Sequence, residues 1–145
     1  MTDIQAAVGR EQLRRLPRIV QERREIAARY ASLLGDAAGA GAEAPSEPAY
    51  CRTNWQSYCV RITDSDDQRR VMQEMLEAGV STRRGIMCAH REKAYSATIL
   101  RLSLPHSTRA QDHCVLLPLF AGLTPDDQRG VVAALTRAIH RNGCA

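Results

Sequence analysis

The sequence predicts an α/β fold, a small two-layer α/β sandwich in which a short sheet is covered by helices and preceded by a long kinked helix. Three observations support this prediction. Apolar residues recur at three- and four-residue steps over residues 1–34, which is typical of a helix. Short segments rich in strand formers then alternate with shorter helical segments. The strands are few, so helices must cover their sheet to bury a core.

The size and composition indicate one globular domain over residues 1–145. A chain of 145 residues with 44% hydrophobic and 25% charged residues can bury a core of its own. No segment reaches the roughly 20 apolar residues of a membrane span, and the N-terminus does not resemble a signal peptide, so a cytoplasmic location is expected. The net charge of +4 comes from arginines mixed with acids along helices, which argues against nucleic acid as a partner.

The long helix is predicted over residues 1–34. Thr2 and Gln5 have the spacing of a capping box at its start. Pro17 interrupts the helical periodicity, which predicts a kink. Residues 35–50 are rich in Gly, Ala and Pro and predict a surface loop after the helix.

Residues 51–145 are predicted to form the sandwich. Gln56–Ile62 alternates in polarity and predicts a strand. Asp64 and Ser65 are expected to cap the next helix, which Gly79 ends.

Three shorter elements and a closing helix complete the prediction. Residues 80–82 and 115–117 are expected to be strands, with a brief helix starting at Ser107 or Thr108 and ending near residue 113. The last helix is expected from Thr124, an N-cap residue followed by proline and two acids, to about residue 141.

The stretch TRRGIMCAHREKAY, residues 82–95, carries the candidate chemistry. Arg83 and Arg84 follow a predicted strand, where sheets often bind ligands, and arginine forks suit phosphate oxygens. Their spacing is equally consistent with two surface arginines. His90 can bind a substrate or serve in acid–base chemistry, although a lone histidine is more often structural. Lys93 is the single lysine and could form a Schiff base if its pKa were depressed, but its polar neighbours favour an exposed position.

Other motifs are informative mainly by what they exclude. There is no Gly-rich phosphate loop, no Gly-x-Ser-x-Gly and no paired-carboxylate motif, so a self-sufficient active site is not expected. The five cysteines form no Cys-x-x-Cys pair, and no metal site is expected. Trp55 either lines a pocket or, as is favoured, anchors the sheet to the first helix.

Four segments resemble the C-terminal part of the DegT/DnrJ/StrS-type sugar aminotransferases, in the family's order. They are MTDIQAAVGREQLRRLPRIVQERREIAARYASLL, TNWQSYCVRI, GVSTRRGIMCAHREKAY and LLPLFAGLTPDDQRGVVAAL. The resemblance implies the aspartate-aminotransferase fold, pyridoxal phosphate as cofactor, a nucleotide-sugar substrate and a homodimeric intact enzyme. It also implies that the cofactor-binding large domain, which carries the Schiff-base lysine, is absent from these residues. Met1 coincides with an internal methionine of the family pattern.

The resemblance assigns residues to the substrate side of the active site. Arg83, Arg84 and Gly85 match an Arg-Arg-Gly of one subgroup, and His90 matches the histidine of the substrate-side loop. Ser57 and Tyr58 match a strand that faces the same cleft.

No catalytic or cofactor-binding residue is carried over, because Lys93 does not match the family's lysine. The chain is therefore expected to contribute to substrate binding and to be inactive, without bound cofactor, on its own. The alternative is a stand-alone ligand-binding or interaction module that kept the fold without catalysis.

Overall fold

A four-stranded antiparallel sheet lies at the centre of the computed structural model, which describes residues 1–36, 41–62, 67–85, 87–95 and 103–141. The strand order is β1-β2-β4-β3. The central strands are β2 (Tyr58–Ile62) and β4 (Cys114–Leu117). The edge strands are β1 (Ala42–Glu43) and β3 (Arg83–Arg84), of two residues each.

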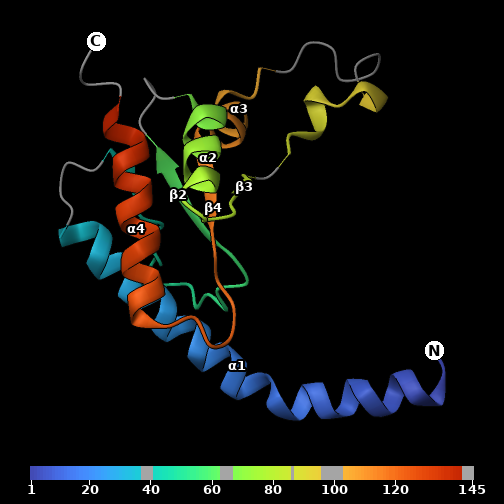
Figure 1. Cartoon of the computed structure of the whole chain (residues 1–145). Helices are drawn as coiled ribbons and strands as arrows, with labels where there is room; N and C mark the ends of the chain where they lie inside the picture. The colour runs from blue at the N-terminus through green and yellow to red at the C-terminus, as the bar shows by residue number, and fades with distance from the viewer. Residues whose placement is uncertain (37–40, 63–66, 86, 96–102, 142–145) are drawn as a thin grey trace.

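The first helix, α1 (Asp3–Asp36), is the longest element and continues through Pro17. Figure 1 shows that it changes direction along its length, as the predicted kink requires. Its capping box is also confirmed, since the amide of Gln5 donates to Thr2 Oγ1 at 3.3 Å and the amide of Thr2 donates to Gln5 Oε1 at 2.9 Å. Only the second half of α1 packs on the sheet, and the first half projects from the body of the domain (Figure 1).

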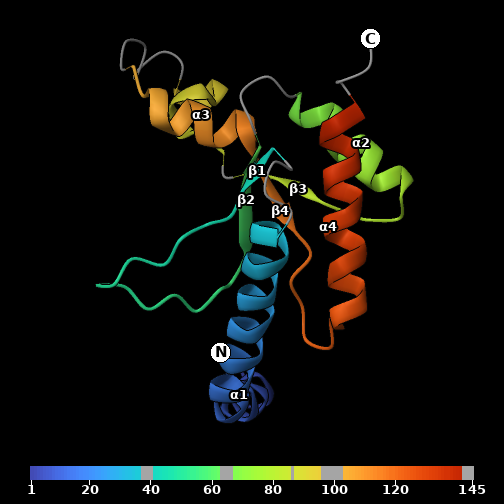
Figure 2. The ribbon, with the colours of Figure 1, turned by 90° about the vertical axis from the view of Figure 1, so that its left-hand side faces the viewer.

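Three further α-helices are α2 (Gln68–Glu77), α3 (Pro105–His113) and α4 (Pro125–His140). Figure 2 shows α2 and α4 together on one side of the strands and α3 on the other side, near one end. Two 3-10 turns, η1 (Ala89–Arg91) and η2 (Lys93–Tyr95), precede α3.

The core lies between one face of the sheet and helices α1, α2 and α4. Alternate residues of β2 and β4 point into it, as the period of a strand requires. The residues of this cluster that are less than 2% exposed are Tyr30, Tyr58, Val60, Ile62, Val71, Met75, Val115 and Leu135. The buried side chains of the strands and the apolar stripes of the helices therefore meet in a single layer.

Two boundaries differ from the prediction. The second helix begins at Gln68 with Asp67 as its N-cap, whose carboxylate accepts from the Arg69 amide at 2.9 Å; residues 64–65 lie outside the described residues. The strand predicted at 80–82 forms instead at 83–84, because the amide of Val80 still donates to the Met75 carbonyl at 2.8 Å in the turn that ends α2.

Smaller differences concern the other elements. The brief helix starts at Pro105, a favourable first helical residue, rather than at Ser107 or Thr108. Strand β1 lies inside the segment predicted as loop. Gly79 ends α2 with φ +82°, as expected, and Thr124 caps α4. Among the described helices, none combines the length and the apolar character needed to cross a membrane.

Candidate functional site

The register of the sheet separates Arg83 from Arg84. Arg83 pairs with Leu116 and Arg84 with Val115 across the β3–β4 ladder. Paired residues of an antiparallel ladder point to the same face, and successive residues point to opposite faces. Val115 is buried in the core layer, whereas Leu116 is half-buried on the opposite face. The two arginines predicted to act together therefore lie on different sides of the sheet.

Arg83 belongs to the face of the sheet opposite the core, which we call the open face. Leu116 pairs with Cys59 as well as with Arg83, so these three residues form a row across β3, β4 and β2. Cys114 lies diagonally from Cys59 in this ladder. Burial, and then the neighbouring Cys114, raises the pKa of Cys59 to about 12. The Cys59 thiol therefore stays protonated near neutral pH and is a poor nucleophile.

Arg84 lies on the other side, next to α2. It lines a hollow of about 300 Å³ together with residues of α2 and the segment that leads into β3. Both Arg83 and Arg84 are exposed.

The segment 87–95 is fixed to α3 by several contacts. The amide of Cys88 donates to Gln111 Oε1 at 2.7 Å, and Arg91 binds both carboxylate oxygens of Asp112 at 2.6 and 2.8 Å. The half-buried His90 has Nε2 3.4 Å from Thr108 Oγ1. This segment therefore holds His90 at a defined position beside α3.

Gly85 is buried where β3 meets the end of α3. Its amide donates to the Cys114 carbonyl at 2.9 Å. A Cβ atom at this position would lie 2.8 Å from the Ala110 carbonyl oxygen and 3.0 Å from Cys114 Cβ. Glycine is required here by the close approach of two backbones, and it presents no surface to a ligand.

The two candidate residues at the start of β2, Ser57 and Tyr58, also differ in exposure. Ser57 is exposed immediately before the strand, whereas Tyr58 is 0% exposed in the core. The Tyr58 ring lies 5.0 Å from that of Tyr30 and 5.5 Å from that of Trp55. Trp55 therefore packs on the core, as favoured from the sequence.

The Tyr58 hydroxyl is buried and has no hydrogen-bond partner among the described residues. Burial raises the pKa of Tyr58 to about 12. The structure thus brings Ser57, Arg83 and His90 within reach of solvent, but buries Tyr58 and Gly85.

A buried polar contact between α1 and α4 was not found from the sequence. Gln128 is 0% exposed; its Nε2 donates to the Ile26 carbonyl at 2.9 Å, and its Oε1 accepts from Arg29 Nε at 2.7 Å. A glutamine in the first turn of a helix gives no signal of burial, because its partners are distant in sequence. Arg23 similarly donates to the carbonyls of Trp55 and Gln56, at 3.4 and 3.1 Å, and ties the segment before β2 to α1.

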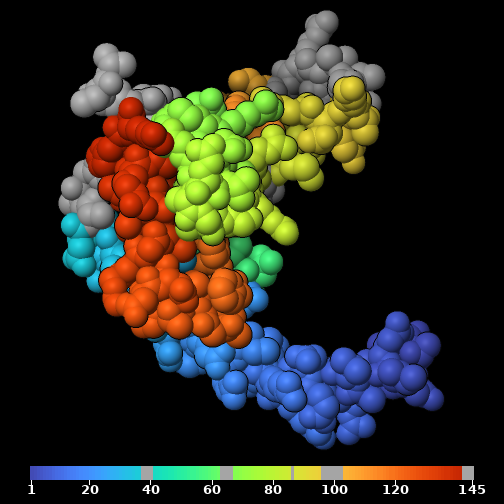
Figure 3. All heavy atoms as spheres, viewed as in Figure 1, coloured from blue at the N-terminus to red at the C-terminus, as the bar shows by residue number. Residues whose placement is uncertain are grey.

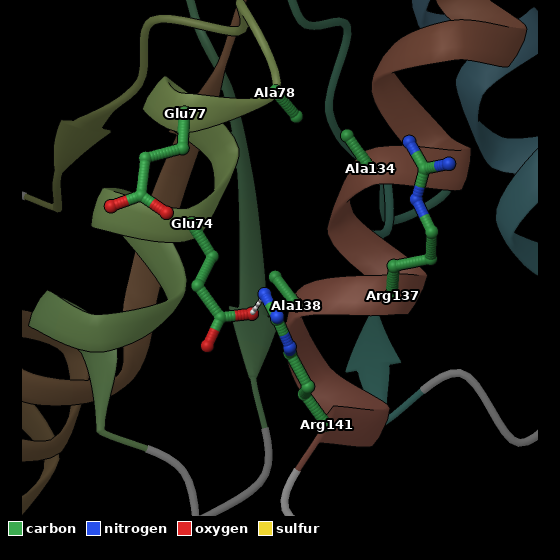
Figure 4. Close-up of a pocket in the computed structure, with 7 residues that line it drawn as sticks. All are labelled: Glu74, Glu77, Ala78, Ala134, Arg137, Ala138 and Arg141. Carbon is green, nitrogen blue, oxygen red and sulfur yellow. Dashed lines mark ion pairs between the residues drawn. The ribbon is translucent and has the colours of Figure 1, made fainter.

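Another hollow, of about 450 Å³, lies between α2 and α4 (Figure 4). Arg141 reaches from the end of α4 toward Glu74 of α2, at 3.9 Å, and Glu74 also pairs with Arg70 at 2.8 Å. The carboxylate of Glu74 is therefore already engaged by two arginines, and this arrangement ties the two helices together.

Lys93 is exposed on η2, as its polar neighbours predicted. It lines neither of the hollows described above. Within the described residues, no three His, Cys, Asp or Glu side chains gather where they could hold a metal ion.

An α/β arrangement of a four-stranded antiparallel sheet with a long first helix matches an aminotransferase-fold domain. The family follows from the sequence match. Residues 1–136 match the model of the DegT/DnrJ/EryC1/StrS aminotransferase family, and the chain belongs to this family, which is pyridoxal-phosphate-dependent.

Solved structures agree with this assignment. The aminotransferase TlmJ from Streptoalloteichus hindustanus is 31% identical over 92% of this chain and 35% of its own, with a TM-score of 0.80. Spr1654 from Streptococcus pneumoniae, in its PMP form, is 22% identical over 97% and 36%, with a TM-score of 0.82. DesI, solved in the presence of its TDP-sugar product, is 24% identical over 90% and 33%, with a TM-score of 0.79.

Spr1654 and DesI, at 22% and 24% identity, show a shared fold alone. The chain spans about a third of the length of these solved relatives.

Proposed function

We propose that these residues form the substrate-side part of a nucleotide-sugar aminotransferase that depends on pyridoxal phosphate. The observation that carries the proposal is the open face of the sheet, which presents Arg83, together with the nearby segment 87–95 that hydrogen bonds and an ion pair hold on α3. Figure 3 supports it: the surface is hollowed between the dark-blue first part of α1 and the yellow segment around residues 87–95. Other residues of the family's fold are proposed to complete this cleft.

The charges suit the proposed substrate. A nucleotide diphosphate sugar carries negative charge on its phosphates, and Arg83 can donate charge-assisted hydrogen bonds to a phosphate oxygen. Ser57 adds an exposed hydroxyl at the start of β2, and His90 adds an imidazole whose ring is held by Thr108. These groups bind and orient the substrate; they do not carry out the amino-group transfer.

The cofactor is proposed to be held by residues outside this sequence. Pyridoxal phosphate supplies an electron sink for amino-group transfer when it is bound. The exposure of Lys93 and the coverage of about a third of the solved relatives both support a Schiff-base lysine elsewhere in the family's fold. The intact enzyme is proposed to be a cytoplasmic homodimer, and this chain alone is proposed to be catalytically inactive.

The projecting half of α1 fits the same proposal. Ile4, Val8, Leu13 and Leu16 are exposed apolar side chains on this half. Packing against the rest of the fold would remove them from water. The same exposed side chains are the observation that favours the alternative, an interaction module that binds another protein without catalysis.

A titration of the 145-residue chain with a TDP-sugar tests the substrate side. We expect weak, salt-sensitive binding that Arg83→Ala reduces about tenfold, because one charge-assisted hydrogen-bond donor is lost. Arg137→Ala, an exposed arginine of α4 on the other side of the sheet, is the matched control and should leave the affinity unchanged. Binding that is absent, or that both variants weaken equally, would contradict the proposed role of the open face.

Addition of pyridoxal phosphate tests the cofactor proposal separately. We expect no absorbance band of an internal aldimine. A band that disappears in Lys93→Arg would show that Lys93 is a cofactor lysine after all. Saturable binding of a TDP-sugar without that band, and without transaminase activity in the isolated chain, is the combination that the proposal requires.

A further inference from the structure

The hollow beside Arg84 has the composition of an anion site with an apolar wall. Arg69 and Arg84 provide two guanidinium groups, Ser81 a hydroxyl group, and Met72 and Leu76 the apolar wall. Arg69, Met72 and Leu76 are spaced three and four residues apart and therefore lie on one side of α2. The volume of about 300 Å³ is at the lower end of the range for small-molecule pockets.

The two guanidinium groups of this hollow lack partners among the described residues. In the part of the chain that the structure describes, the guanidinium groups of Arg69 and Arg84 make no hydrogen bond or ion pair. By contrast, the next residue of α2, Arg70, pairs with Glu74 and donates to the Ala138 carbonyl, each at 2.8 Å.

The hydroxyl of Ser81 adds a polar group to the hollow. Ser81 is exposed and lines the hollow next to Thr82, whose own Oγ1 is enclosed by the fold and is not presented to a ligand. Two cations without partners and an exposed hydroxyl at one hollow favour an anionic ligand.

We propose that this hollow binds a small phosphate monoester whose ester group is apolar. Arginine forks match phosphate oxygens, which can accept from the guanidinium groups and from the exposed Ser81 hydroxyl. The exposed Leu76 and the adaptable side chain of Met72 contact the apolar ester group.

This site is distinct from the substrate side proposed above. Arg84 points to the α2 side of β3 because it pairs with Val115, whereas Arg83 points to the open face because it pairs with Leu116. The inference therefore does not depend on the proposed aminotransferase role. A ligand of this hollow does not touch the open face.

Phenyl phosphate is the probe, and inorganic phosphate is its comparison. Titration of the 15N-labelled chain with phenyl phosphate should give saturable shifts of the Arg69 and Arg84 Nε–H signals and of the Ser81 and Thr82 amides. Inorganic phosphate should bind the same groups more weakly, because it lacks the apolar ester group. Equal affinity for the two probes would overturn the role of the Met72–Leu76 wall.

Variants separate this hollow from the open face. Replacing both arginines, Arg69→Ala with Arg84→Ala, should weaken phenyl phosphate binding by about tenfold or more, and Ser81→Ala should weaken it by removing the exposed hydroxyl. Arg83→Ala and Arg10→Ala should leave the affinity unchanged. Saturable shifts that are absent, or lost in Arg83→Ala and retained in the double variant, would overturn the proposal. Unchanged backbone spectra elsewhere establish that each variant is folded.

Discussion

Gly85→Ala is the substitution whose effect follows most directly from the structure. The added Cβ would lie 2.8 Å from the Ala110 carbonyl oxygen and 3.0 Å from Cys114 Cβ. The first of these is a backbone atom near the end of α3, so relief requires the segment at Gly85 to move away from the junction of α3 and β4. Overpacking of this kind costs about 1–3 kcal/mol. In a chain of this size each kcal/mol lowers Tm by about 2–4 °C, which gives an expected decrease of roughly 2–12 °C.

Thermal unfolding followed by circular dichroism measures this decrease, and Gly130→Ala is the matched control. A Cβ at Gly130 meets nothing within 4 Å, and Gly130 lies inside α4. The same chemical change should therefore raise stability there, by about 0.5–1 kcal/mol, because alanine favours a helix over glycine. If Gly85→Ala were as stable as the parent while Gly130→Ala behaved as expected, the close packing of Gly85 against the junction of α3 and β4 would be refuted.

Three further substitutions test the core and the titrating groups. Gln128→Leu removes the acceptor of Arg29 and the donor to an α1 carbonyl, so urea unfolding should show a loss of about 1–3 kcal/mol; an unchanged midpoint would contradict this. Tyr58 has a pKa raised from 10.0 to about 12, so its contribution to stability is complete below pH 10 and is lost as pH rises toward 12. In Tyr58→Phe the urea midpoint should accordingly decrease less between pH 10 and pH 12 than in the parent. An identical decrease in both proteins would show that ionisation of the buried Tyr58 does not cause it. Hydrogen bonds from Thr124 lower the pKa of Asp127, so this stabilisation is present above the ordinary value of 3.8 and is lost as pH falls through the folded value. Thr124→Ala should lower the urea midpoint at pH 7 more than at pH 3, whereas equal losses at both would exclude the linkage.

Elements defined by their own periodicity could be predicted from the sequence. Tyr58–Ile62 alternates between buried and half-buried residues, and Pro125–His140 begins after Thr124, the N-cap residue that the sequence indicated. The position of β3 could not be predicted, because a two-residue edge strand forms only where the chain reaches β4. The turn after Gly79 takes up Val80 before that point, so tertiary pairing moves the strand to residues 83–84.

The candidate site was harder to predict because it depends on register. The resemblance to the family named Arg83, Arg84 and Gly85 as neighbours with one role, and nothing local to these residues separates them. Separation requires Leu116 and Val115 as their partners across the ladder, and these lie more than 30 residues later in the sequence. Tyr58 was named with Ser57 for the same reason, and strand alternation buries one and exposes the other.

A short motif can therefore serve several structural roles at once. In Arg-Arg-Gly, the first residue faces the open side of the sheet, the second faces the hollow beside α2, and the third allows the end of β3 to lie against the junction of α3 and β4. These roles are coupled through the backbone, because the packing at Gly85 holds the β3 edge from which both arginines project. Gly85→Ala should then weaken binding on both faces, whereas Arg83→Ala and Arg84→Ala should each affect one. This difference in pattern distinguishes a residue that positions the strand from residues that contact ligands.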